Sequence, residues 1–291
     1  MGKTGTCQLC KKETVLELSH LIPKFIFRWI KETGTGYMRT SDNFNKRIQD
    51  GFKDYFLCAD CEDLFCEDEN YFAKNIFLPV VNRDVAVLEY DHRFYGCVVS
   101  IFWRVLKYTI LAEEKDQAFY PALCALEKEW RLGLLSQGWN REDNRLHLLS
   151  GVDIVTVVAE DPVEVPDKMI QYMGRMVDAG IADSDTKCML FLKIPRFLFI
   201  YQLFGFDGAD FISTCIRPEG GYYDRGSAKI ADTDVAGFFL GRAKMVEKMF
   251  SGMSPGQREK TQKFSDEKRN EVQGKDLGKI LGYAQRKSNN N

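Results

Sequence analysis

The sequence has little net charge, few histidines and no segment that resembles a secretory leader. A formal net charge of −2 over 291 residues excludes a general polyanion binder, so contact with nucleic acid needs a local basic face. The start of the chain, Met1 to Thr6, is short and polar and lacks the apolar core of a signal peptide. We therefore expect a cytoplasmic protein.

An uninterrupted apolar run that could cross a membrane is also missing. The longest candidate, residues 188–206 (CMLFLKIPRFLFIYQLFGF), carries Lys193, Pro195 and Arg196 in its middle. Because charges are costly in lipid and proline interrupts regular structure, the segment predicts two buried strands joined at Pro195. We expect no membrane contact.

Cysteine, by contrast, is plentiful, and four of the nine cysteines form two C-x-x-C pairs. In a reducing compartment such pairs indicate metal binding before disulfide formation. Four thiolates complete the closed tetrahedral shell that structural zinc prefers. The alternative is two unrelated pairs of free thiols, since 47 residues separate them. The predicted zinc ligands are Cys7, Cys10, Cys58 and Cys61, and the cysteines interpreted as small core residues are Cys66, Cys97, Cys124, Cys188 and Cys215.

Composition divides the chain into three parts. Residues 1–75 hold both cysteine pairs, one histidine and a Gly/Asn-rich loop or short hairpin excursion. Residues 76–253 contain the longer periodic segments. Residues 254–291 have nine basic residues against five acidic ones and predict a polar helix or disordered tail, or alternatively an arm that contacts phosphates. We expect an α+β chain in which a small zinc-bound module precedes a larger, helix-rich α/β domain.

The middle part mixes two kinds of periodicity. Apolar residues recur at helical spacing in 96–114, 120–139 and 234–253, whereas 152–161 is rich in the β-branched residues that strands favour. A Gly-rich stretch at 217–229 predicts a hairpin turn. We expect helices packed on a few strands, in a domain that could also join a homo-oligomer or bind a partner protein.

A histidine follows the first cysteine pair, in LSHLIPKF at 18–25, and the second pair lies in LCADCEDLF at 57–65. Acidic residues follow Cys61, as in the first turn of a helix. A zinc turn, a β segment that carries a histidine, an excursion and a second zinc turn that opens a helix resemble the HNH endonuclease family, with its treble-clef, ββα-metal core. The resemblance covers about residues 5–70.

The resemblance implies metal-assisted phosphodiester hydrolysis, with Mg²⁺ or Mn²⁺ in addition to zinc, and an association with bacterial defence against foreign DNA. His20 matches the general base. Glu62 stands where the family has its final histidine or asparagine, and Ser19 stands where a metal ligand is expected. Asp54 and Glu62 supply oxygen ligands suited to a hard cation. The neighbourhood of the family's orienting asparagine holds Lys53 and Asp54, with Asn43 and Asn45 as alternatives if the loop folds back.

The first part of the chain is electrically polarised. Residues 1–53 contain ten Lys or Arg against five Asp or Glu, whereas 54–69 contain seven acidic residues and no basic ones. Basic side chains alternate with aromatic ones, which indicates a surface that pairs with phosphates and stacks on bases, DNA more than RNA. The alternative is an amphipathic helix whose aromatic residues pack inward. The predicted nucleic-acid contacts are Lys24, Arg28, Lys46, Arg47 and Lys53.

Two interpretations therefore compete for the first part of the chain. In the first, His20, Glu62 and Asp54 act as the catalytic residues of an HNH-type nuclease. In the second, the same zinc scaffold has a decayed metal site and binds nucleic acid or protein without cutting it. The other two histidines, His92 and His147, have no partner at a suitable spacing, and we interpret both as structural.

Overall fold

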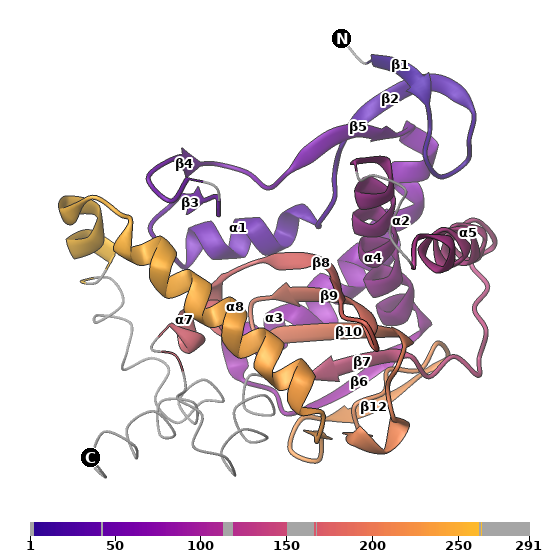
Figure 1. Ribbon diagram of the computed structural model, residues 1–291. Coiled ribbons are helices and arrows are strands. Elements are labelled where there is room, and N and C mark those ends of the chain that lie inside the picture. Colours follow the sequence, from indigo (N-terminus) through magenta and orange to yellow (C-terminus); the bar gives the residue numbers. More distant parts are fainter. Residues whose placement is uncertain are drawn as a thin grey trace.

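A four-stranded antiparallel sheet forms the middle layer of an α+β fold, in the order β7-β10-β9-β8 (Figure 1). The computed structural model describes residues 3–41, 43–112, 119–149, 166, 168–261 and 263. The strands are β7 (Leu146–Leu149), β8 (Asp178–Asp183), β9 (Cys188–Ile194) and β10 (Phe197–Phe204). Pro195 lies in the turn between β9 and β10, which confirms the prediction for this segment.

Helices cover both faces of this sheet, which explains the apolar run in its central strands. α7 (Met169–Arg175) and α8 (Thr233–Ser251) pack on one face, and α4 (His92–Ala112) packs on the other. Every residue of β9 is buried. Lys193 is buried with the rest, and its Nζ donates a hydrogen bond to the carbonyl of Met176 at 2.7 Å.

The predicted helices of the middle part are confirmed as α4, α5 (Tyr120–Ser136) and α8. α2 (Ala59–Tyr71) continues through a π-helical turn, η1 (Phe72–Phe77), into α3 (Leu78–Arg83). Both α2 and α5 pack against α4. The predicted strand at 152–161 and all of the polar part after residue 263 lie outside the described residues.

Within the described parts of the chain, α4 is the one helix long and apolar enough to cross a membrane. Of its apolar window, 72% is buried inside the protein. A core helix that contacts α2, α5 and the central sheet has this composition without any membrane.

The first part of the chain forms a second antiparallel sheet, in the order β1-β2-β5. The chain leaves β2 for α1 and a two-stranded hairpin before it returns to β5 and enters α2, so the predicted excursion is confirmed (Figure 1). The elements are β1 (Lys3–Thr6), β2 (Glu13–His20), α1 (Lys24–Glu32), β3 (Met38–Arg39), β4 (Arg47–Ile48) and β5 (Lys53–Leu57).

The predicted hairpin at 217–229 is wrong. Its strand, β12 (Gly220–Asp224), pairs antiparallel with β6 (Val87–Asp91), far earlier in the chain. Gly220 has a φ of +102°, and a Cβ there would come within 2.6 Å of the Tyr90 carbonyl oxygen, so the glycine permits a close crossing of β6. The end of this stretch, β13 (Lys229–Ile230), pairs with β11 (Phe211–Ile212), which follows the short 3₁₀ turn η2 (Gly208–Asp210).

The hydrophobic core runs across the predicted boundary at residue 75. Phe72 is fully buried, and its ring contacts Phe25 of α1 as well as Phe197 and Phe199 of β10. The regions before and after residue 75 therefore share one set of apolar contacts. These contacts do not mark a boundary, and the division into an N-terminal module and a larger domain stays a prediction.

Candidate metal centre and histidine site

The four predicted zinc ligands come together at one end of the β1-β2-β5 sheet. The Sγ atoms of Cys7, Cys10, Cys58 and Cys61 all lie within 4.8 Å of one another, and those of Cys10 and Cys58 are 3.9 Å apart. None of the four forms a disulfide. The 47-residue excursion between the pairs leaves and returns as predicted.

Local backbone geometry places each thiol. In the turn between β1 and β2, Lys11 takes the left-handed conformation, with a φ of 64°, and its amide donates to the Cys7 carbonyl at 2.9 Å. At the second pair, Cys58 is the N-cap of α2, and its carbonyl accepts the amide of Cys61 at 3.1 Å. One pair thus lies in a β-turn and the other in the first turn of a helix.

The surroundings of Cys7 favour a thiolate. Burial opposes ionisation, but hydrogen bonds from the backbone amides of Cys10, Cys58 and Leu9 outweigh it and lower the pKa of Cys7 to about 7. Burial and the neighbouring thiols raise the pKa of Cys61. A bound cation would remove that cost, since metal ligation deprotonates thiols.

The four thiols fit a tetrahedral metal ion such as zinc. Zinc–sulfur bonds of about 2.3 Å imply sulfur–sulfur separations of about 3.8 Å in a tetrahedron. The observed sulfur positions, all within 4.8 Å, need only small movements to reach that shape. Of the other cysteines, Cys97 and Cys188 are buried as predicted, but Cys66 is exposed on α2, so the core prediction for it is wrong.

His20 is the last residue of β2, and its imidazole is held by a carboxylate that sequence reasoning missed. His20 Nε2 lies 3.0 Å from Asp50 Oδ1, and Asp50 Oδ2 lies 2.5 Å from Lys53 Nζ. Burial opposes ionisation of Asp50, but hydrogen bonds from Lys53 and His20 outweigh it and hold its pKa well below the ordinary range. The available signal was the Asp50-Gly51 dipeptide, a pair of residue types common in turns, shortly before the strand that begins at Lys53.

The two asparagines proposed as alternatives, Asn43 and Asn45, have partners other than His20. Asn45 Nδ2 donates to the carbonyl of Gly252 at 3.2 Å, and Asn45 Oδ1 accepts the amide of Ser254 at 3.1 Å. Asn45 thus fastens the excursion to the end of α8. Asn43 Oδ1 accepts the backbone amide of Asn45 within the same loop. The carboxylate of Asp50 occupies the position beside the imidazole.

Strand pairing separates the other residues predicted beside His20. His20 pairs with Lys53 and Ser19 pairs with Asp54, so each pair lies on its own face of the β2-β5 ribbon. Ser19 is buried at 2% exposure and Asp54 is exposed. The assignment of Asp54 as a catalytic residue stays a prediction, and alternation along β5 directs its side chain away from the face of His20.

Glu62 lies in the first turn of α2, directly after the second cysteine pair. Its Oε1 atom is buried and has no hydrogen-bond partner among the described residues. An orphaned buried carboxylate oxygen needs a cause, and a cation is one. In the described parts of the chain, however, only the four cysteines form a group of three or more closely spaced metal-binding side chains.

Other acidic residues of α2 have structural partners. Glu69 pairs with Arg104 at 2.8 Å, and Glu67 pairs with Arg93 at 3.3 Å. Asp68 faces Gly96 of α4, and burial raises its pKa to about 6. These contacts fasten α2 to α4.

The predicted nucleic-acid residues lie on or beside three elements, α1, β4 and β5. Lys24 and Arg28 are exposed, four residues apart on α1, and Lys46 and Arg47 are exposed at the start of β4. Lys53 is partly buried in its ion pair with Asp50. These five basic side chains therefore have different surroundings, and four of them face solvent.

The aromatic residues of α1 do not join this surface. Phe25 and Trp29 both pack edge-on against Phe77, with ring centres 5.3 and 5.8 Å apart, and Phe27 is buried. The alternative of an amphipathic helix with inward aromatics is confirmed, and base stacking by these rings is not available.

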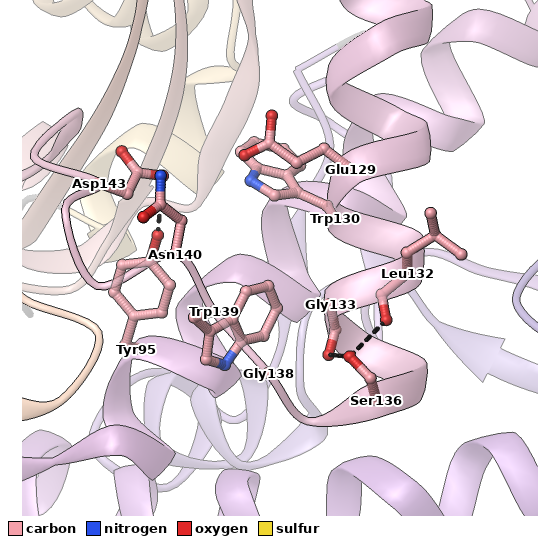
Figure 2. Close-up of a pocket in the computed structure, with 10 residues that line it drawn as sticks. All are labelled: Tyr95, Glu129, Trp130, Leu132, Gly133, Ser136, Gly138, Trp139, Asn140 and Asp143. Atoms are coloured by element: carbon pink, nitrogen blue, oxygen red, sulfur yellow. Dashed lines mark hydrogen bonds between the residues drawn. The ribbon is translucent and has the colours of Figure 1, made fainter.

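A cavity of about 310 Å³ lies between the end of α5 and the loop that follows it (Figure 2). The rings of Tyr95, Trp130 and Trp139 line it. At its edge, the carboxylate of Asp143 accepts hydrogen bonds from Tyr95 at 3.1 Å and Tyr201 at 2.8 Å. Trp130 is one of the residues that line the cavity, and its Nε1 atom is buried and has no hydrogen-bond partner among the described residues.

No protein-family model, curated protein or solved structure matches this chain. The function must therefore be inferred from the geometry of the cysteines, His20 and Asp50.

Proposed function

We propose that the chain is a metal-dependent nuclease of HNH type, built on a structural zinc site that Cys7, Cys10, Cys58 and Cys61 form. The position of His20 carries the proposal. It ends the first strand of a β2-β5-α2 unit, the four cysteines close that unit at its base, and a carboxylate holds its imidazole. This order of elements resembles a ββα-metal core.

The contact with Asp50 gives His20 the chemistry of a general base. In the tautomer that donates from Nε2 to Asp50, Nδ1 carries a lone pair and accepts the proton of an attacking water. Asp50 fixes the ring and stabilises the imidazolium that forms, as a carboxylate does behind other catalytic histidines. Lys53 keeps Asp50 ionised.

The residues present fit a second, hard cation in part. Glu62 would hold it through its unpartnered oxygen, and magnesium sites commonly use one or two carboxylates completed by water and substrate phosphates. When bound, such a cation neutralises charge on the phosphate that is cleaved. The chain itself supplies the base and the basic side chains that bind the polyanion.

Cleavage of DNA tests the proposal. We would incubate the purified full chain with plasmid and with single-stranded DNA in Mg²⁺ or Mn²⁺, beside His20→Ala. The matched control is His92→Ala, because His92 is exposed at the start of α4. Loss of a general base lowers the rate by about 10²–10⁴-fold, whereas the control should cut at the wild-type rate. Equal cleavage by His20→Ala, or no cleavage by the wild type with either metal, contradicts the proposal.

A second candidate is a zinc-dependent module that binds nucleic acid without cutting it. The observation that favours it is that the described residues hold no group of three metal-binding side chains besides the cysteines. Under this alternative DNA binding survives His20→Ala and no metal supports cleavage. A gel shift beside the cleavage assay separates the candidates: DNA binding by the wild type without cleavage in either metal favours the binding module, and cleavage that His20→Ala loses favours the nuclease.

A further inference from the structure

Arg104 is a buried arginine that ties α4 to the backbone of His20. Its side chain is 2% exposed. Nη1 donates to the His20 carbonyl at 3.0 Å, and Nη2 donates to Glu69 Oε1 at 2.8 Å. Further hydrogen bonds run to Ser100, from Nε to its carbonyl at 3.2 Å and from Nη2 to its hydroxyl at 3.1 Å.

The packing of α4 alone does not require a charged residue at position 104. Its neighbours Trp103 and Leu106 are fully buried apolar residues. A buried guanidinium loses hydration, and the loss is recovered only where good geometry and an opposite charge replace water. Glu69 provides the charge, and the ring of Phe65 lies 5.1 Å below the guanidinium carbon. What the arginine adds is a fixed bond to one carbonyl of β2.

We propose that Arg104 is a positioning residue for His20, an inference that rests on the proposed nuclease function. His20 has Lys53 as its register partner on β5, Asp50 on its imidazole and Arg104 on its carbonyl. His20 is the last residue of β2, where a strand end is otherwise free to move. Without Arg104 the backbone of His20 shifts, and the imidazole loses its alignment with Asp50.

This assignment makes the region after residue 76 part of the histidine site. Arg104 projects from α4, which also packs against α2, α5 and strands β6, β8 and β9. The region after residue 76 thus contributes Arg104, a side chain that holds the proposed general base His20. It does more than support the N-terminal module. A planar, forked guanidinium reaches the carbonyl and Glu69 together, which the single ammonium of lysine does not.

NMR of the imidazoles tests the proposal without relying on activity. The chain has three histidines, so each ring can be followed in ¹⁵N spectra. We would compare Arg104→Gln and Arg104→Lys with Arg196→Gln in the full chain. Arg196 is a matched control: it is 5% exposed, donates to the Val80 carbonyl at 2.7 Å and pairs with Asp84.

In the wild type we expect the Nε2-protonated tautomer of His20. In Arg104→Gln the two tautomers of His20 should exchange, so that the Nε2 signal moves toward their average. In Arg104→Lys the same signal should move less. The lysine variant also tests the proposal if the glutamine variant does not fold. DNA cleavage should fall about 100-fold in kcat, with KM changed less than about twofold, because misplacement of a base slows chemistry. Arg196→Gln should keep the His20 signal and the rate.

Unchanged His20 signals in both Arg104 variants overturn the proposal. The same signal movement in Arg196→Gln also overturns it, because the effect would then be general loosening of the fold. If the wild type cuts no DNA, the proposed function fails, and the imidazole signals still decide whether Arg104 positions His20.

Discussion

His20 Nε2 and Asp50 Oδ1 lie 3.0 Å apart, and this contact joins the end of β2 to the loop that returns to β5. The carboxylate also pairs with Lys53, the register partner of His20. The imidazole is therefore oriented by the same short segment that closes the ribbon.

Asp50→Ala should slow DNA cleavage about 100-fold without loss of DNA binding, because an imidazole without its orienting carboxylate samples unproductive tautomers and rotamers. Single-turnover rates measure the effect. Asp63→Ala is the control, since Asp63 is exposed on α2. A wild-type rate in Asp50→Ala removes Asp50 from the mechanism.

Asp68 should make the chain less stable as the pH rises. Because burial raises its pKa from 3.8 to about 6, the folded state binds the proton more tightly, so stability is full below about pH 4 and falls as the pH rises to 6. Two pKa units correspond to about 3 kcal/mol, and partial exposure reduces this to about 1 kcal/mol. Asp68→Asn should therefore raise Tm by about 2 °C at pH 8 and leave it unchanged at pH 4.

Calorimetry at the two pH values checks this, with Asp63→Asn on the same helix as a control that should show no such pH dependence. A Tm increase of equal size at both pH values would mean that the asparagine acts through packing or helix propensity instead of through ionisation.

Phe72→Ala should destabilise the whole chain by about 4 kcal/mol, the usual cost of deleting a fully buried ring. Because Phe72 joins α1 to β10, the variant should still unfold in a single transition, with its midpoint at a lower urea concentration than that of the wild type. Urea unfolding measures it, with the half-exposed Phe52 changed to Ala for comparison. Two separated transitions would instead support the boundary at residue 75.

Lys24→Ala combined with Arg28→Ala should weaken DNA binding and reduce the slope of log affinity against log salt by about 2, since each lost phosphate contact contributes about 0.9. The control is Lys244→Ala with Lys248→Ala, an exposed pair of the same spacing on α8. Fluorescence anisotropy over a salt series gives both slopes. Equal slopes for the two variants would show that α1 does not contact phosphates.

Local patterns predicted the parts of the fold that depend on local chemistry. The two C-x-x-C pairs converge, and the run through Pro195 forms two buried strands, because turn geometry and apolar periodicity are properties of short segments. The β12–β6 pairing was missed because its partner lies more than a hundred residues away, and no local signal specifies it.

Asp50 and Arg104 were missed for the same reason. In the sequence Asp50 resembles a turn residue, and Arg104 resembles a single charge within an apolar helix. Only the tertiary structure places Asp50 against the imidazole of His20 and Arg104 against its carbonyl. Glu62 was singled out from the sequence because it directly follows the second cysteine pair, and its role stays a prediction.

In the proposed function, four thiolates hold one zinc ion, which closes the β2-β5-α2 unit and thereby sets His20 in place. Native mass spectrometry of the full chain, purified without chelator, tests it most directly. One zinc per chain in the wild type and in Cys66→Ser, and none in Cys58→Ser, is the predicted result. A wild-type chain without metal, or a disulfide between any two of these four cysteines, would contradict it.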